Sequence, residues 1–409
     1  HAVNILYVAY SCDPYAGSED KIGWSVPFES ARSNRVHVLT KEEQREPIER
    51  YLAAHPACDI RFHYVDIPPV CKRLLGESLY SGRLGIWNRR AYATAARICA
   101  SEAIDLIHQV TPVEFRAIGD YGRIGNVPFV CGPVGGAEYI PPGLRGYAQG
   151  HEAQELVRRA ANALSRWHLA TSGVLGRVDH VLFANRETQD YLGDLCGGQD
   201  ARPYPEIGVG EQELARRRRR RHDGCTILVA GRLVYRKGHD LLLDALAGLP
   251  ADVRCECRIV GDGPCREALG RRCQGDARLR DRVVLTGAAS FEGMTEEYQN
   301  ADVLVMPSLR ETSGSVVLEA MARGLPVITI GRFGGAEMVD AGVGWLYAGT
   351  DQGSYVRSLQ EALIECIASP EERERRGGRA RGRAEHYTWG TKVTHYQDIY
   401  DRLVPGERT

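Results

Sequence analysis

The chain has 409 residues, a length typical of two domains, of which 43% are hydrophobic and 26% are charged. The 52 Lys and Arg residues balance the 53 Asp and Glu residues, so a formal charge of −1 argues against nucleic acid as a partner. No window approaches the roughly 18 apolar residues of a membrane-spanning helix, and none is expected. Twelve scattered cysteines and no signal-peptide pattern favour a cytoplasmic protein with reduced thiols and no metal.

Strand-like and helix-like segments alternate along the first half of the chain. The first apolar run, 4–9, is followed by a turn at 11–17 and by a helical pattern from Glu19. Further strand-like runs lie at 36–40, 60–65, 105–108, 128–131 and 180–184. Alternation of this kind predicts a parallel sheet with helices on both faces.

A second series of apolar runs predicts a second domain of the same type. These runs lie at 226–230, 258–260, 283–286, 303–306 and 326–329. We expect an N-terminal domain at 1–204, a linker at 205–224, a C-terminal domain at 225–385 and a C-terminal helix at 386–409 that could cross back. Two such doubly wound α/β domains would face each other across a cleft at the carboxyl ends of their strands, where anionic ligands bind.

The expected linker contains six consecutive arginines, Arg216 to Arg221. A block of like charges beside a linker is more typical of a solvated loop than of an anion-binding patch. We therefore assign these arginines no function.

Two glutamates stand out in SLRETSGSVVLEAMARGLPVI, residues 308–328. Glu311 would follow the strand 303–306, and a helix beginning near Ser315 would carry Glu319 about two turns further on. The N-terminal N–H groups of that helix would suit a phosphate. Taken alone, Glu319 could equally lie on a solvated helix face.

A cationic loop, GRLVYRKG at 231–238, directly follows the strand 226–230. Arg232 supplies a planar fork and Lys237 a compact charge, a combination that suits a diphosphate. The spacing of a Walker loop is missing, which argues against hydrolysis of a nucleoside triphosphate. The glycine turns at 261–264 and 334–335 could be plain turns.

In combination, the motifs GRLVYRKG, IVGDGP, VVLTGAAS, ADVLVMPS, ETSGSVVLEAMARGLPVI, GGAEMV and GVGWLY resemble the family 4 glycosyltransferases of the GT-B fold. The resemblance is close over 227–346 and looser through NILYVAYSCDPYAGSE near the N-terminus. It implies two Rossmann-like domains and a retaining, metal-independent hexosyltransferase. A nucleotide sugar, commonly a UDP-sugar, would be its substrate, and no cofactor is implied.

By position, the resemblance also implies roles for individual residues. Arg232 and Lys237 would neutralise the donor diphosphate, and Glu311 would contact the donor sugar. Glu319 would bind the ribose hydroxyls. The other donor-binding residues that the resemblance implies are Gly17, Ser18, Gly287, Thr312, Ser313, Gly314, Ser315 and Val316.

One family feature is missing from the sequence. Many members carry a histidine just after the strand that here is PFVC, whereas this chain has a glycine-rich loop. Its role would pass to Gly135, Gly136 or Glu138, as acceptor-binding residues, or to His108 as a catalytic residue. His108 could equally be a core histidine.

The resemblance favours transfer of a sugar to a hydroxyl of a small molecule, a natural product such as an aminoglycoside, or a glycan. Two other functions fit the same fold. One is a sugar-nucleotide epimerase or hydrolase, and the other is a non-catalytic protein that binds nucleotide sugars.

Overall fold

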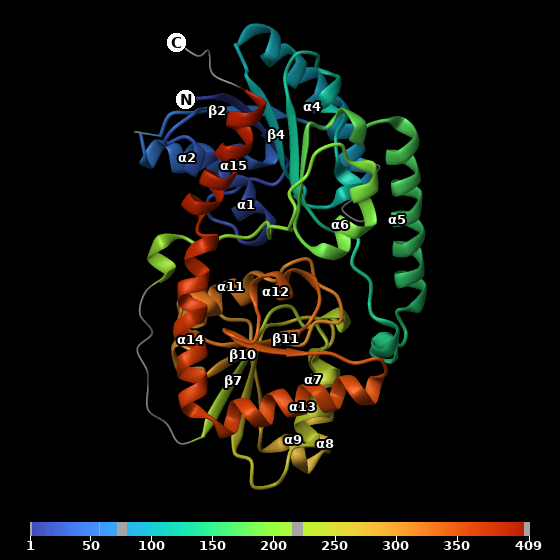
Figure 1. The fold of residues 1–409 in the computed structure, drawn as a ribbon, viewed down its shortest axis with the longest axis vertical. Coiled ribbons are helices and arrows are strands. Elements are labelled where there is room, and N and C mark those ends of the chain that lie inside the picture. The colour runs from blue at the N-terminus through green and yellow to red at the C-terminus, as the bar shows by residue number, and fades with distance from the viewer. Residues whose placement is uncertain (1, 57, 72–79, 215–223, 405–409) are drawn as a thin grey trace. The chain divides into compact units, whose positions relative to one another are not determined.

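The computed structural model describes residues 2–56, 58–71, 80–214 and 224–404, so the predicted loop at 216–221 lies outside the described residues. The chain forms two compact units (Figure 1). The first unit contains residues 1–137, 160–208 and 389–409. The second unit contains residues 138–159 and 209–388.

The first unit is built on a six-stranded parallel sheet in the order β3-β2-β1-β4-β5-β6. Its strands are β1 (Asn4–Ala9), β2 (Arg35–Lys41), β3 (Ile60–Val65), β4 (Leu106–Thr111), β5 (Phe129–Val134) and β6 (His180–Phe183). Nearly all side chains of β1, β4 and β5 are buried, as expected for strands covered on both faces.

The second unit repeats this strand order in a sheet arranged β12-β11-β10-β7-β8-β9, also parallel. Its strands are β7 (Cys225–Ala230), β8 (Cys255–Val260), β9 (Val283–Gly287), β10 (Val303–Met306), β11 (Val327–Ile330) and β12 (Gly344–Tyr347). The prediction of two doubly wound parallel sheets is confirmed. The short strand β12 is absent from the predicted strands.

Most helices lie between consecutive strands, and α13, α14 and α15 follow the last strand. In the order of the chain the helices are α1 (Ser18–Ser30), α2 (Arg45–Ala54), α4 (Tyr80–Ser101), α5 (Glu152–Ser172), α6 (Arg186–Leu192), α7 (His239–Ala247), α8 (Arg266–Gly275), α9 (Ala277–Arg280), α10 (Phe291–Asn300), α11 (Ser315–Ala322), α12 (Phe333–Met338), α13 (Gln352–Ala368), α14 (Pro370–Ala384) and α15 (Trp389–Leu403). Side-chain caps mark several starts: Ser290 accepts a hydrogen bond from the Gly293 amide at 3.1 Å, and Asp351 forms a capping box with Ser354.

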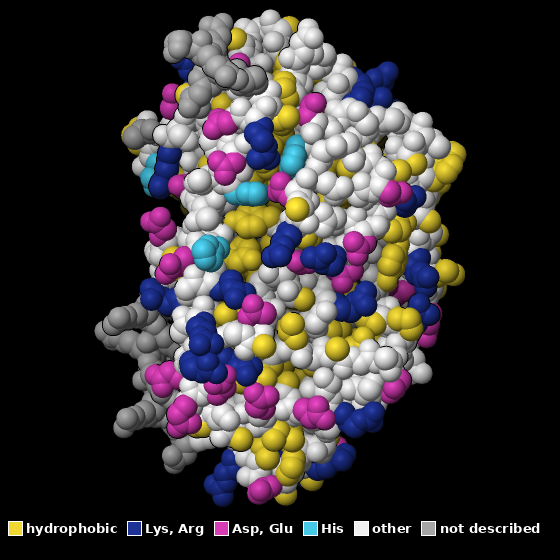
Figure 2. Space-filling view, in the orientation of Figure 1, with side chains coloured by type: hydrophobic (Ala, Val, Ile, Leu, Met, Phe, Trp, Pro, Cys, Tyr) yellow, Lys and Arg dark blue, Asp and Glu magenta, His cyan; other side chains and the backbone are white. Residues whose placement is uncertain are grey.

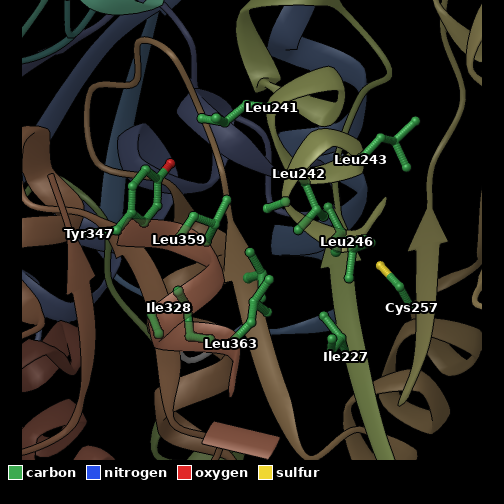
Figure 3. Close-up of a cluster of buried hydrophobic side chains, with 14 of the residues drawn as sticks. Ile227, Leu241, Leu242, Leu243, Leu246, Cys257, Ile328, Tyr347, Leu359 and Leu363 are labelled. Atoms are coloured by element: carbon green, nitrogen blue, oxygen red, sulfur yellow. The ribbon is translucent and has the colours of Figure 1, made fainter. Parts of the chain in front are cut away.

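The core of the second unit lies between its sheet and the helices α7 and α13. Leu242 and Leu246 of α7 and Leu359 and Leu363 of α13 are among the buried side chains of this cluster (Figure 3). The same core takes in Ile140, Leu144 and Ala148, which come from the segment between β5 and β6. Burial of these apolar side chains explains why 138–159 belongs to the second unit rather than to the expected domain 1–204.

The C-terminal helix α15 belongs to the first unit. Its Val393, Tyr396 and Tyr400 lie in one buried cluster with Tyr7 of β1 and Trp24 of α1. The helices α1 and α15 run side by side (Figure 1). The chain therefore returns at Trp389 to the unit in which it began.

Cationic and anionic side chains are interspersed on the face of the molecule that Figure 2 shows. This mixture fits the formal charge of −1. All twelve cysteines are free thiols. Among the described helices, none combines the length and the apolar character that crossing a membrane requires.

A fully buried lysine on α15 leads to a prediction about pH. Lys392 donates a hydrogen bond to the carbonyl of Pro205 and lies 3.9 Å above the ring of Tyr204. Burial lowers its pKa from 10.5 to about 7, and the charge of Glu206 offsets only part of that effect. Between these two values the unfolded chain binds a proton that the folded chain does not, so stability rises with pH.

We expect Lys392 itself to contribute stability that rises between about pH 7 and 10, by at most about 1.4 kcal/mol per pH unit. The melting temperature of the wild type minus that of Lys392→Met should therefore increase with pH over this range. Lys21→Met, on α1 of the same unit, is the matched control and should keep the wild-type slope. Equal slopes in wild type and Lys392→Met would contradict the prediction.

Candidate functional site

The loop after β7 carries the predicted cations. Lys237 contacts a carboxylate oxygen of Glu311 through its ammonium group, and the guanidinium of Arg236 lies 3.8 Å from the same oxygen. Among the described residues, none forms a hydrogen bond or ion pair with the side chain of Arg232, which is exposed. The loop therefore presents one free cation and two cations directed at Glu311.

Glu311 lies in the loop that follows β10, and its side chain is only 13% exposed. Burial alone would raise the pKa of this carboxyl, but the charges of Lys237 and Arg236 outweigh burial and hold the pKa below its usual value of 4.5. Glu311 is therefore a buried, ionised carboxylate at neutral pH. The expected proximity of Glu311 and Lys237 is present in the structure, whereas Arg236 was missed although it directly precedes Lys237 in the motif.

The two loops are joined through their backbones as well. The amide of Leu309 donates a hydrogen bond to the carbonyl of Arg236 at 2.8 Å. Gly238 has a φ of 69°, and a Cβ at this position would lie 2.0 Å from the carbonyl oxygen of Pro307. Only glycine allows the cationic loop to approach the loop of Glu311 this closely.

We therefore expect Gly238→Ala to disrupt both loops, because alanine adds a backbone clash and an unfavourable φ. The melting temperature should fall, and Lys237 should lose its contact with Glu311. The control is Gly378→Ala within α14, where a Cβ meets nothing within 4 Å and should stabilise the helix by about 0.5–1 kcal/mol. Equal melting temperatures for the two variants would contradict this prediction.

The helix α11 begins at Ser315, as predicted, and follows a glycine, Gly314. Ser313 is buried, whereas Thr312 and Val316 are partly exposed. Glu319 is half-buried and accepts a hydrogen bond from the hydroxyl of Tyr298 at 2.8 Å. Glu319 thus does not lie on a freely solvated helix face, and its partner Tyr298 was not found from the sequence.

Glycine backbones meet at the carboxyl ends of three neighbouring strands in the second unit. The amide of Gly231 donates to the carbonyl of Val260 at 3.0 Å, and the amide of Gly261 donates to Gly287 at 2.8 Å. A Cβ on Gly261 would lie 1.9 Å from the carbonyl oxygen of Gly231. The predicted glycine turn at 261–264 therefore follows a strand end at this edge of the sheet, whereas Gly334 and Gly335 lie in α12 rather than in a turn.

The predicted residues of the first unit lie near the start of α1 and the end of β5. Gly17 and Ser18 are exposed at the N-terminus of α1. The next residue, Glu19, accepts hydrogen bonds from the amide of Val113 at 2.6 Å and from the hydroxyl of Ser11 at 3.2 Å. Burial raises the pKa of Glu19. These contacts fix the beginning of the helix to the ends of β1 and β4.

The glycine loop after β5 is tied into its own unit. The amide of Gly135 donates to the carbonyl of Val113 at 2.8 Å, and the carbonyl of Gly136 accepts from Asn162 at 3.0 Å. The backbone amide of Gly135 is thus engaged within the fold, contrary to its expected use for an acceptor. In the second unit, Glu138 is 1% exposed and lies 3.6 Å from Arg158, so this carboxylate is also engaged.

The structure argues against a catalytic role for His108. Its side chain is fully buried, with Nδ1 2.6 Å from the hydroxyl of Tyr400 and Nε2 2.7 Å from the carbonyl of Gly132. Burial lowers the pKa of His108 to about 3, so the ring is neutral at physiological pH. Because both ring nitrogens are engaged, the geometry corrects the expected role and favours the core histidine that the sequence left open.

In the part of the chain that the structure describes, no three His, Cys, Asp or Glu side chains gather as metal ligands. The site residues that come together are therefore one carboxylate and its cations in the second unit. Such an arrangement can bind an anion and stabilise positive charge beside it.

One known protein family matches the part of the chain that carries these residues. Residues 211–383 match the family described as Glycosyl transferases group 1. This range contains both the cationic loop and the Glu311 loop. The matched range lies within the second unit.

Curated relatives are glycosyltransferases by name. The sulfoquinovosyl transferase SQD2 of Arabidopsis thaliana is 34% identical over 175 residues, 41% of this chain and 31% of that protein. A GDP-mannose-dependent phosphatidylinositol monomannoside mannosyltransferase of Mycolicibacterium smegmatis is 31% identical over 242 residues, 54% of this chain and 62% of that protein. A D-inositol 3-phosphate glycosyltransferase of Salinispora tropica is 28% identical over 383 residues, 84% and 76% of the two chains. The chain spans less than two thirds of the first two relatives.

Solved structures share the fold at low sequence identity. Sucrose-phosphate synthase from Thermosynechococcus elongatus aligns with a TM-score of 0.65 and 20% identity over 98% of both chains. The glycosyltransferase WaaG aligns with a TM-score of 0.59 and 17% identity over 98% of this chain and 100% of that one. HepE of Anabaena in complex with UDP-glucose aligns with a TM-score of 0.61 and 16% identity, over 97% of this chain and 99% of that one. The fold is that of the GT-B glycosyltransferases.

Proposed function

We propose that the protein is a retaining glycosyltransferase that moves a hexose from a nucleotide sugar to a hydroxyl of a small molecule or glycan. A UDP-sugar is the first candidate for the donor. The observation that carries this proposal is the buried Glu311 carboxylate held by Lys237, with the free cation of Arg232 in the same loop. A donor sugar diphosphate has the complementary charges. Its diphosphate is anionic, and its anomeric carbon becomes positive as the bond breaks.

The proposed step divides the work between the two loops of the second unit. Arg232 and Lys237 neutralise the diphosphate as negative charge develops on it, which favours the transition state over the ground state. Glu311 stabilises positive charge at the anomeric carbon. The bond from that carbon to the diphosphate breaks while the acceptor oxygen bonds to the same face. The departing phosphate oxygen takes the acceptor proton.

Other predicted donor contacts complete the proposal. Glu319 would accept hydrogen bonds from the ribose hydroxyls, and the backbone of 313–316 at the start of α11 would face the distal phosphate. In the first unit, Gly17 and Ser18 are exposed at a helix N-terminus, which suits contact with a phosphate.

The known relatives support this choice of substrates. HepE has been solved with UDP and with UDP-glucose, and the mycobacterial relative is named for its dependence on GDP-mannose. Relatives named for D-inositol 3-phosphate and for a phosphatidylinositol mannoside support a hydroxyl as the acceptor. A metal-independent reaction is proposed because the side chains of Arg232 and Lys237 supply the cationic charge.

The test is incubation of the protein with UDP-glucose, GDP-mannose and an ADP-sugar, with and without an acceptor pool that contains D-inositol 3-phosphate and an aminoglycoside. We expect one donor to release its nucleoside diphosphate faster when an acceptor is present, with a new glycoside of the same anomeric configuration. Equal release without acceptor would indicate a hydrolase instead. No binding and no turnover of any donor would contradict the proposal.

A further inference from the structure

One carboxylate outside the predicted site contacts both of its loops. Glu155, at the start of α5, accepts a hydrogen bond from the hydroxyl of Tyr235 at 2.7 Å and from the guanidinium of Arg310 at 2.8 Å. Tyr235 precedes Lys237 by two residues, and Arg310 directly precedes Glu311. The same Glu155 oxygen, Oε1, accepts both bonds, so one atom connects the two loops.

The surroundings of Glu155 hold it in place. The side chains of Glu155 and Arg310 are only 15% and 13% exposed, so the ion pair is largely shielded from water. The ring of His151, one helical turn earlier, stacks on Tyr235 with centroids 3.8 Å apart. Burial would raise the pKa of Glu155, but the bonds from Tyr235 and Arg310 lower it overall, and the group is ionised at neutral pH.

The ion pair between Glu155 and Arg310 also neutralises a charge beside Glu311 in the sequence. Arg310 is the neighbour of Glu311 in sequence, and Glu311 already has two cations directed at it. Without Glu155, the guanidinium of Arg310 would have no anionic partner although its side chain is largely buried. An unpaired guanidinium at such a site is unfavourable, so we expect the Arg310 side chain to leave it and to shift the loop that also carries Glu311.

We infer that Glu155 is a positioning residue for sugar transfer, which holds the Lys237 loop and the Glu311 loop together. The inference rests on the proposed function, and it assigns part of the donor site to 138–159, a segment between β5 and β6 of the first sheet. Glu155 touches neither donor nor reacting atoms in this scheme. Its effect passes through Tyr235 and Arg310.

The kinetic test uses the full chain with the donor that the wild type turns over. Glu155→Ala should lower kcat about tenfold or more with a smaller change in KM, because the catalytic groups are displaced after the donor has bound. Glu155→Gln keeps the size of the side chain and one hydrogen-bond acceptor. Its kcat should lie between those of the wild type and Glu155→Ala. Glu152→Ala, an exposed acid on the same first turn of α5, is the control and should match the wild type.

A second substitution separates positioning from mere support of the fold. In the double variant Glu155→Ala with Arg310→Gln, the unpaired cation that would shift the Glu311 loop is gone, so we expect several-fold recovery of kcat over Glu155→Ala. A residue that only stabilised the fold would give a double variant no faster than the single one. That result, or wild-type kcat in Glu155→Ala, would overturn the inference.

A measurement without turnover keeps the inference testable if the proposed function fails. Labelling of Lys237 by an amine-reactive acetylating reagent, followed by mass spectrometry of the peptide, reports whether its contact with Glu311 persists. We expect Lys237 to be labelled several-fold faster in Glu155→Ala than in the wild type or in Glu152→Ala. Equal labelling in all three would overturn the inference, whatever the substrate. A wild type inactive on every donor would instead contradict the proposed function alone.

Discussion

Replacement of Glu311 by Gln is expected to lower the rate of sugar transfer by about 10²–10³-fold while the second unit stays folded. The amide keeps the size of the side chain but removes the charge that Lys237 and Arg236 hold in place. Stabilisation of positive charge at the anomeric carbon would then be lost, although the donor diphosphate could still bind. The loss should therefore appear mainly in kcat.

The measurement is initial-rate kinetics with the active donor, combined with circular dichroism to verify the fold. Glu296→Gln, which changes an exposed acid on α10 of the same unit, is the control and should keep the wild-type rate. Transfer by Glu311→Gln within about threefold of the wild-type rate would contradict the role given to this carboxylate.

Replacement of Lys237 by Met is expected to have a comparably large effect, about 10²-fold or more on kcat/KM. The change removes a cation from the donor diphosphate and also leaves the buried Glu311 carboxylate with only the more distant Arg236. Because burial would then outweigh the remaining charge, the pKa of Glu311 should rise. The melting temperature should fall together with the activity.

Arg232→Met separates the loss of a cation for the diphosphate from the loss of the partner of Glu311. Arg232 is exposed and has no side-chain partner among the described residues, so its removal should leave the melting temperature unchanged. Affinity for the nucleoside diphosphate should fall about tenfold, as measured by calorimetry. Wild-type affinity in both variants would contradict the assignment of these cations to the diphosphate.

Local patterns were sufficient to predict much of the fold. The apolar runs predicted β1 and β10 with their observed bounds, and the helix predicted to begin near Ser315 is α11. The sequence placed both loops after strands, and the observed pairing of β7 with β10 brings Lys237 close to Glu311.

Contacts between distant parts of the chain could not be predicted from such patterns. His108 is held by Tyr400, 292 residues away, and nothing near His108 signals that its nitrogens are both engaged. Likewise, Ile140 and Leu144 are ordinary apolar residues after β5, yet they pack in the core of the second unit and bring Glu155 to the two loops. Which core an apolar residue joins depends on tertiary packing rather than on local periodicity.

The proposed function requires the cations of the β7 loop to bind a sugar diphosphate beside Glu311. The most direct measurement is a crystal structure of the protein with the intact donor that it turns over, or with UDP-glucose if turnover is slow. We predict diphosphate oxygens within hydrogen-bond distance of both Arg232 and Lys237, with the hexose next to Glu311. A nucleotide bound with its diphosphate away from both cations would contradict the proposed function.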